Sequence, residues 1–113
     1  MDFQKIIDRN NEIIQYYIAS DKRRLGKEWD RGEYAKALAA DVGALIKYTQ
    51  AKDGLRHVDD VDQKLKHEIG DVLSCLIIIA QKYDIDIEQA FFDTMDELEE
   101  RGKKQELHKS HTL

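Results

Sequence analysis

The stretch IGDVLSCLIIIA at residues 69–80 decides the fold class. It is apolar on almost every side of a helix, although it contains Asp71 and directly follows Glu68. A run of this length is too short to span a bilayer, and a helix that is apolar all round must be surrounded by protein. We therefore expect a central, buried helix from about Val61 to Tyr83.

The remainder of the chain also favours helices. Its 113 residues include no proline and only six glycines, and 36% of them are charged. This composition suits long helices because proline removes a backbone donor and clashes inside a helix. Apolar residues at helical spacing predict a first helix from about Asp2 to Leu25. The fold class is therefore all-α.

Capping patterns mark the second and fourth helices. Asp30 and Glu33 form a capping box, and Asp86 has Gln89 at the corresponding position. Asp53-Gly54 is expected to end the second helix. The loop that follows leads to two N-cap candidates for the third helix, Asp59 and Asp60. The apolar faces are expected to point inward, with Tyr34, Leu38, Val42, Leu45, Ile46 and Tyr48 on the second helix and Ile87, Ala90, Phe91, Met95 and Leu98 on the fourth.

These elements predict one helical-bundle domain at residues 1–102, followed by a polar, flexible tail at residues 103–113. Four helices from one chain can barely enclose a helix that is apolar all round. We therefore expect a second subunit to help, in a homodimer or a homotetramer.

Composition and charge exclude several classes of function. The net charge of −5 argues against binding a nucleic-acid polymer, which needs a concentrated basic face. Cys75 is the single cysteine and is expected to be a buried structural thiol. Met1 precedes Asp2 without a basic and then apolar leader. We therefore expect a cytoplasmic protein that does not associate with membranes.

The candidate chemistry lies in acidic residues within apolar surroundings. Glu68 and Asp71 are three residues apart and so share one face of the third helix. Asp41 lies among Leu38, Val42 and Leu45 on the second helix, where a free carboxylate is equally out of place. Burying carboxylates together is costly unless a cation or hydrogen bonds compensate. Three converging oxygen ligands would suit Mg²⁺, whereas salt bridges to neighbouring helices are the alternative.

At this point the sequence resembles the MazG-like all-α nucleotide pyrophosphohydrolases. These carry Glu-x-x-Glu on one helix and Glu-x-x-Asp on the next, and HEIGDVL at residues 67–73 resembles the second motif. ADVGAL at residues 40–45 resembles the first, and residues 79–91 and 94–101 resemble the turn into the last helix and its continuation. The similarity covers about residues 30–101. It implies an all-α fold, Mg²⁺ held by Asp41, Glu68 and Asp71, and hydrolysis of a nucleoside triphosphate to the monophosphate and pyrophosphate.

The first motif departs from the family pattern. Ala44 occupies the position of the second acid and cannot bind a metal. Water could fill the vacant ligand position and leave a weakened site. Alternatively, the protein has lost hydrolysis and is a degenerate, non-catalytic module that binds nucleotides or assembles. A plain helical interaction domain, whose acids all form salt bridges, is a further alternative.

Basic residues near these helices are the candidates for substrate contacts. Lys47 lies one turn beyond Ala44, and Lys52 lies near the loop between the two acidic helices. Lys47 is expected to meet a phosphate oxygen, with a solvated lysine as the alternative, and Lys52 and Arg56 are weaker candidates. Trp29 is expected to be a packing anchor rather than a base-stacking residue.

Overall fold

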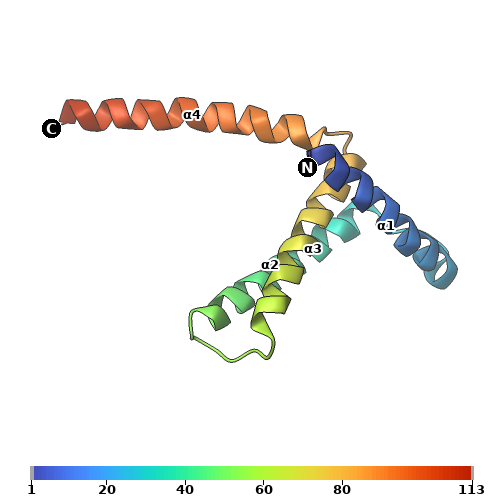
Figure 1. Cartoon of the computed structure of the whole chain (residues 1–113). Coiled ribbons are helices and arrows are strands. Elements are labelled where there is room, and N and C mark those ends of the chain that lie inside the picture. The colour runs from blue at the N-terminus through green and yellow to red at the C-terminus, as the bar shows by residue number, and fades with distance from the viewer. Residues whose placement is uncertain (1, 113) are drawn as a thin grey trace.

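The computed structural model describes the backbone of residues 2–112 and the side chains of residues 2–106, and its described part contains four helices and no strand. The helices are α1 (Phe3–Leu25), α2 (Arg31–Lys52), α3 (Val61–Lys82) and α4 (Ile87–Thr112). This confirms the predicted all-α fold and its element order. Figure 1 shows α2 and α3 running side by side as a hairpin, α1 crossing it near the end of α3, and α4 projecting away.

Local capping explains where most of the helices begin. Asp30 accepts a hydrogen bond from the Glu33 backbone N–H, and the Glu33 side chain accepts one from the Asp30 backbone N–H, which confirms the capping box. Asp86 accepts from the backbone N–H of Gln89 at 3.1 Å, as predicted. Gly54 has φ +81° just beyond the end of α2, the left-handed conformation that glycine adopts freely.

The start of α3 differs from the prediction. Asp60 is its N-cap but has a left-handed backbone, with φ 55°, and its side chain makes no capping hydrogen bond. Asp59 instead contacts His57, with 2.7 Å between Oδ1 and Nε2. Asp60 is therefore confirmed as the N-cap position, whereas Asp59 is not the cap, and the left-handed backbone at Asp60 leaves the helix start without a side-chain capping hydrogen bond.

The core lies where α1, α2 and α3 meet. Tyr34, Cys75 and Ile78 are buried there, with Ile14 and Trp29 packed against them. The Cys75 thiol donates a hydrogen bond to the Tyr34 carbonyl oxygen at 3.2 Å and so links α3 to α2. Burial raises the pKa of the Cys75 thiol, and Asp41 and Asp71 raise it further. The prediction of a buried structural thiol is confirmed.

Polar contacts attach α1 to α3. The Ser74 hydroxyl donates to Asn10 Oδ1, and the Gln81 amide donates to Asn11 Oδ1 at 2.7 Å. The Asn10 Nδ2 is buried without a partner. α1 therefore covers only the C-terminal half of α3, and the N-terminal half keeps a face that α1 does not reach.

Much of the apolar surface lies outside this core. Val42 and Ile46 of α2 are exposed, and so are Phe91, Met95 and Leu98 of α4, so their predicted inward orientation is wrong for the single chain. The radius of gyration is 18.6 Å, whereas a compact domain of 100 residues has about 13 Å. The helices thus form an open arrangement in which α4 buries little of its apolar face.

The division at residue 102 remains a prediction. α4 continues across that position to Thr112, and the side chains of residues 107–113 lie outside the described part. Within that part, no helix is both long and apolar enough to cross a membrane.

Candidate metal centre

Three carboxylates converge between α2 and α3. Asp41 comes from the middle of α2, while Glu68 and Asp71 lie one turn apart on α3. One oxygen from each side chain lies within 4.8 Å of the other two. Glu68 is only 7% exposed, Asp41 is half-buried and Asp71 is exposed. The predicted convergence is therefore present, and it runs from a buried carboxylate to one that solvent reaches.

Glu68 is the acid of the cluster whose negative charge is least compensated. Its Oε1 is buried and has no hydrogen-bond partner. Burial raises the pKa of the Glu68 carboxyl, and a hydrogen bond and charge repulsion from Asp41, followed by repulsion from Asp71, raise it further. Holding three ionised acids this close is unfavourable without compensation. Either a proton or a cation must therefore be shared within the cluster.

The donor set fits a hard divalent cation. Carboxylate oxygens are the ligands that Mg²⁺ prefers, and this ion completes its octahedron with water or substrate oxygens. Asp71, whose side chain is 49% exposed, leaves one side of the cluster open to such ligands. Ala44 is half-buried and lies three residues after Asp41, hence on an adjacent part of the same face of α2. It offers no ligand atom.

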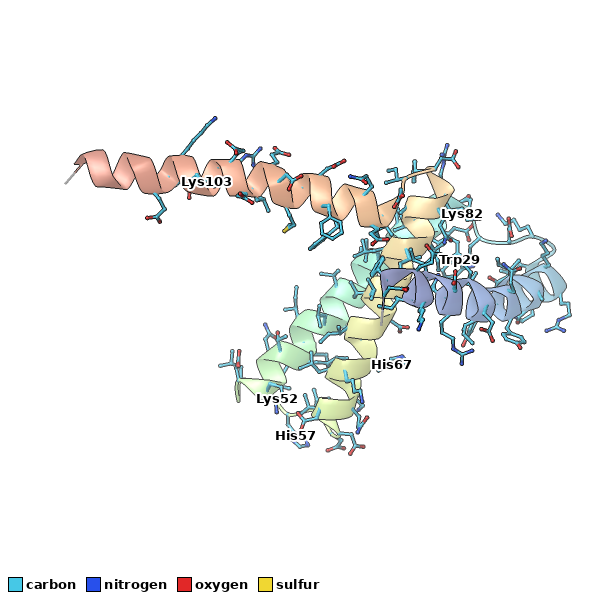
Figure 2. All side chains as sticks on the ribbon, turned by 45° about the horizontal axis from the view of Figure 1, so that its top comes forward. Trp29, Lys52, His57, His67, Lys82 and Lys103 are labelled. Atoms are coloured by element: carbon cyan, nitrogen blue, oxygen red, sulfur yellow. The ribbon has the colours of Figure 1, made fainter. Side chains whose placement is uncertain are left out.

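His67 lies at the open edge of the cluster. Its Nε2 is 3.1 Å from Asp71 Oδ2, and its side chain is 74% exposed. Figure 2 shows the labelled His67 on the side of α3 that points away from α2. His67 is thus a surface histidine whose exposed ring contacts a carboxylate of the cluster.

The predicted substrate lysines are both exposed, and they differ in their contacts. Lys47 forms no ion pair with any described residue, so its ammonium group is available. Lys52 is paired with Asp62, with 2.6 Å between Nζ and Oδ1, at the loop end of the hairpin. Arg56 donates to the Gln50 side chain at 3.4 Å. Of these residues, Lys47 has the fewest competing contacts.

Trp29 is part of the core. Its ring stands edge-on to Tyr34, with 5.5 Å between the centroids, and it packs against the buried cluster. This confirms the prediction of a packing anchor rather than a stacking platform for a base.

Sequence reasoning overlooked a second feature beside the carboxylates. An open hollow of about 380 Å³ is lined by Gln63, Lys66, His67, Gly70 and Asp71, all from α3. Their spacing of three and four residues places them along one side of the helix, so the sequence alone could have indicated this surface.

Comparison with known families identifies the fold. The family model described as the MazG nucleotide pyrophosphohydrolase domain matches residues 31–105. The match spans α2, α3 and most of α4, including all three carboxylates. The chain therefore belongs to the MazG nucleotide pyrophosphohydrolase family, as its sequence predicted. No curated protein and no solved structure matches the chain.

Proposed function

We propose that the protein is a nucleoside triphosphate pyrophosphohydrolase that uses Mg²⁺ held by Asp41, Glu68 and Asp71. The observation that carries this proposal is the unpartnered, buried Oε1 of Glu68 within a cluster of three carboxylates. Structural salt bridges would pair each acid with a base, whereas in the described part of the chain only Asp71 has a basic partner, His67. Membership of the family supports the reaction class.

In the proposed reaction, water attacks the α-phosphorus of the nucleotide. A new P–O bond forms to the water oxygen, the bond from the α-phosphorus to the α,β-bridging oxygen breaks, and pyrophosphate leaves with that oxygen. The water protons pass to solvent. When bound, Mg²⁺ supplies charge neutralisation for the phosphates and lowers the pKa of water.

The contribution of the chain is mainly positioning. Glu68 is fixed by burial and holds the inner side of the site, while Asp71 presents an oxygen at its open edge. These rigid helix positions fix the phosphorus relative to the attacking water, and such positioning and charge stabilisation lower the barrier without covalent chemistry. Lys47 is proposed to meet a phosphate oxygen. Lys52 can do so only by leaving Asp62.

Ala44 supports a second candidate function. One carboxylate fewer than the family pattern lowers the attraction for a cation, even though Mg²⁺ accepts water in the vacant position. A non-catalytic module that binds nucleotides or only assembles is the alternative this residue favours. We favour an enzyme with a weakened metal site, because the three remaining carboxylates still converge.

Self-association is part of the proposal. The chain exposes 8856 Å² of surface, whereas a compact monomer of its 13.2 kDa mass exposes about 6,400 Å². The difference of about 2,400 Å² exceeds the roughly 800 Å² per partner of a standard interface. The exposed apolar residues that a second copy would cover include Val42, Ile46, Ile69, Leu76, Phe91, Met95 and Leu98. We therefore propose a homodimer or homotetramer, and a cytoplasmic location stays a prediction.

The test is pyrophosphate release from a panel of canonical and modified nucleoside triphosphates, with and without Mg²⁺. We expect release that requires Mg²⁺ and yields the monophosphate. Absence of release at high protein concentration, together with no thermal shift on adding Mg²⁺, would overturn the enzyme proposal. A Mg²⁺-dependent thermal shift by nucleotide without release would identify the non-catalytic module.

A further inference from the structure

The hollow on α3 shares a residue with the carboxylate cluster. Asp71 lines the hollow and also contributes to the group of three acids. A ligand bound at the cluster can therefore continue into the hollow without leaving the protein surface. The other lining residues are Gln63, Lys66, His67 and Gly70.

The lining is rich in hydrogen-bond donors. Lys66 carries a positive charge and forms no ion pair with any described residue, so its ammonium group can serve a ligand. The Gln63 amide makes no hydrogen bond within the described residues either. Among the described residues, His67 is paired only with Asp71, with 3.1 Å between Nε2 and Oδ2. Donors of this kind match phosphate oxygens, and no tryptophan, tyrosine or phenylalanine lines the hollow.

Gly70 is one of the residues that line the hollow. Within a helix, glycine costs about 1 kcal/mol relative to alanine. A Cβ built at Gly70 meets nothing within 4 Å, so packing inside the described chain does not require glycine there. The missing side chain deepens the surface next to Asp71, where a ligand would benefit from closer approach to the helix.

We propose that the hollow holds the two terminal phosphates of the substrate, which leave together as pyrophosphate. The α-phosphate then lies at the cluster of Asp41, Glu68 and Asp71. Lys66 and Gln63 contact the leaving group, and Gly70 leaves room for it. This assignment rests on the proposed function, because its ligand is a nucleoside triphosphate. The triphosphate would run across α3 from the carboxylate cluster to the hollow.

The test measures binding of inorganic pyrophosphate and of a nucleoside monophosphate, each in the presence of Mg²⁺, by calorimetry. The variants are Lys66→Ala and Gly70→Ala, and the matched controls on α4 are Lys103→Ala and Gly102→Ala. We expect both hollow variants to weaken pyrophosphate binding by about tenfold, as loss of a charge-assisted contact or of the space for it does. Monophosphate binding and both controls stay within twofold of the unchanged protein.

The melting temperature of the variants distinguishes a lost phosphate contact from a folding defect. Gly70→Ala is expected to keep or raise the melting temperature, because alanine favours the helix and its Cβ meets nothing. Pyrophosphate binding that is unchanged in both hollow variants would overturn the proposal. So would a change in molecular mass of Gly70→Ala, since the glycine would then serve contact between copies.

Failure of the proposed function gives a different result. If the protein hydrolyses nucleotides but pyrophosphate binding does not depend on Lys66, the hollow is not the leaving-group site and the enzyme proposal stands. If pyrophosphate binding depends on Lys66 but no nucleotide is hydrolysed, the hollow is supported and the enzyme proposal fails.

Discussion

The α2–α3 hairpin and α4 have similar sequence patterns, but they differ in which side chains lack a partner. Both contain apolar and acidic residues at helical spacing. The hairpin buries Glu68 and leaves its Oε1 without a partner, whereas α4 leaves Phe91 and Leu98 exposed and pairs two of its acids locally. On α4, Glu97 pairs with Arg101 and Glu99 with Lys103, each four residues apart.

This difference indicates what each region lacks. Pairs at this spacing stabilise a helix on its own surface, so Glu97 and Glu99 need no ligand, while the apolar side chains of α4 need a protein surface to cover them. The hairpin also exposes apolar residues, Val42 and Ile46 among them, but in addition it buries an unpartnered carboxylate that needs a cation. A charge that cannot be paired locally thus marks the site, and apolar residues that cannot be buried locally mark the interface.

The largest expected effect comes from Glu68→Gln. The substitution removes a metal ligand, so we expect pyrophosphate release to fall by at least a hundredfold. It also removes one of three mutually repelling acids, so the metal-free protein should gain about 1 kcal/mol of stability. Enzyme assays and thermal unfolding without metal measure the two effects. Glu100→Gln on α4 is the matched control and should change neither.

The outcome for stability is the more discriminating of the two. A salt-bridged Glu68 would lose stability on conversion to glutamine. Such a loss would contradict the contrast between the hairpin and α4, because Glu68 would then be as locally satisfied as Glu97.

The second test introduces a charge on the exposed face of α4. Phe91→Asp should halve the molecular mass measured by light scattering, or reduce it further for a tetramer, because a carboxylate in an apolar interface is costly. Tyr16→Asp on α1 makes the same kind of change at a residue that is 69% exposed and should leave the mass unchanged. A monomeric unmodified protein would refute the interpretation of α4.

A smaller effect is expected from restoring the fourth acid. Ala44→Glu should tighten Mg²⁺ binding by about tenfold, since it adds a carboxylate on the face of α2 that carries Asp41. The control, Ala39→Glu, adds the same charge at an exposed position of α2. Equal effects of the two variants would mean that net charge, rather than a ligand at residue 44, controls the affinity.

The smallest expected effect is a pH dependence of the metal-free protein. The folded-state pKa of Glu68 lies above its ordinary value of 4.5, so the folded chain holds this proton more tightly than the unfolded chain. The resulting stability is fully present below the ordinary value and is lost as the pH rises through the raised pKa. Unfolding measured from pH 4.5 to 7 should show this loss, and Glu68→Gln should lack it.

Mg²⁺ binding follows the opposite direction, because the ion competes with the proton for the same oxygens. Its affinity should fall as the pH is lowered through the raised pKa of Glu68. An affinity that rises on acidification would contradict the placement of the ion at this carboxylate.

Local rules predicted the helices well. The capping box at Asp30 and Glu33 and the glycine after α2 each depend on neighbouring residues, and both formed as expected. The approach of Asp41 to Glu68 was also predictable, because a carboxylate among apolar residues is costly unless a cation or hydrogen bonds compensate its charge. The left-handed backbone at the N-cap of α3 was not predictable, since the loop decided it.

The exposed face of α4 is a second feature that the sequence could not predict in full. Periodicity identified Phe91, Met95 and Leu98 as a stripe that needs covering, but it could not say which chain covers it. The hollow around Gly70 was predictable from the sequence, because Gln63, Lys66 and His67 recur at helical spacing on the same side of α3 as Gly70 and Asp71.

The central claim is that Asp41, Glu68 and Asp71 act together as one cation site. The most direct measurement is titration calorimetry of Mg²⁺ into the unchanged protein and into Asp41→Asn, a variant on the helix opposite the other two acids. We predict one ion per chain for the unchanged protein and at least a tenfold loss of affinity for the variant. Equal affinity in the two proteins would show that α2 contributes no ligand and would contradict the account.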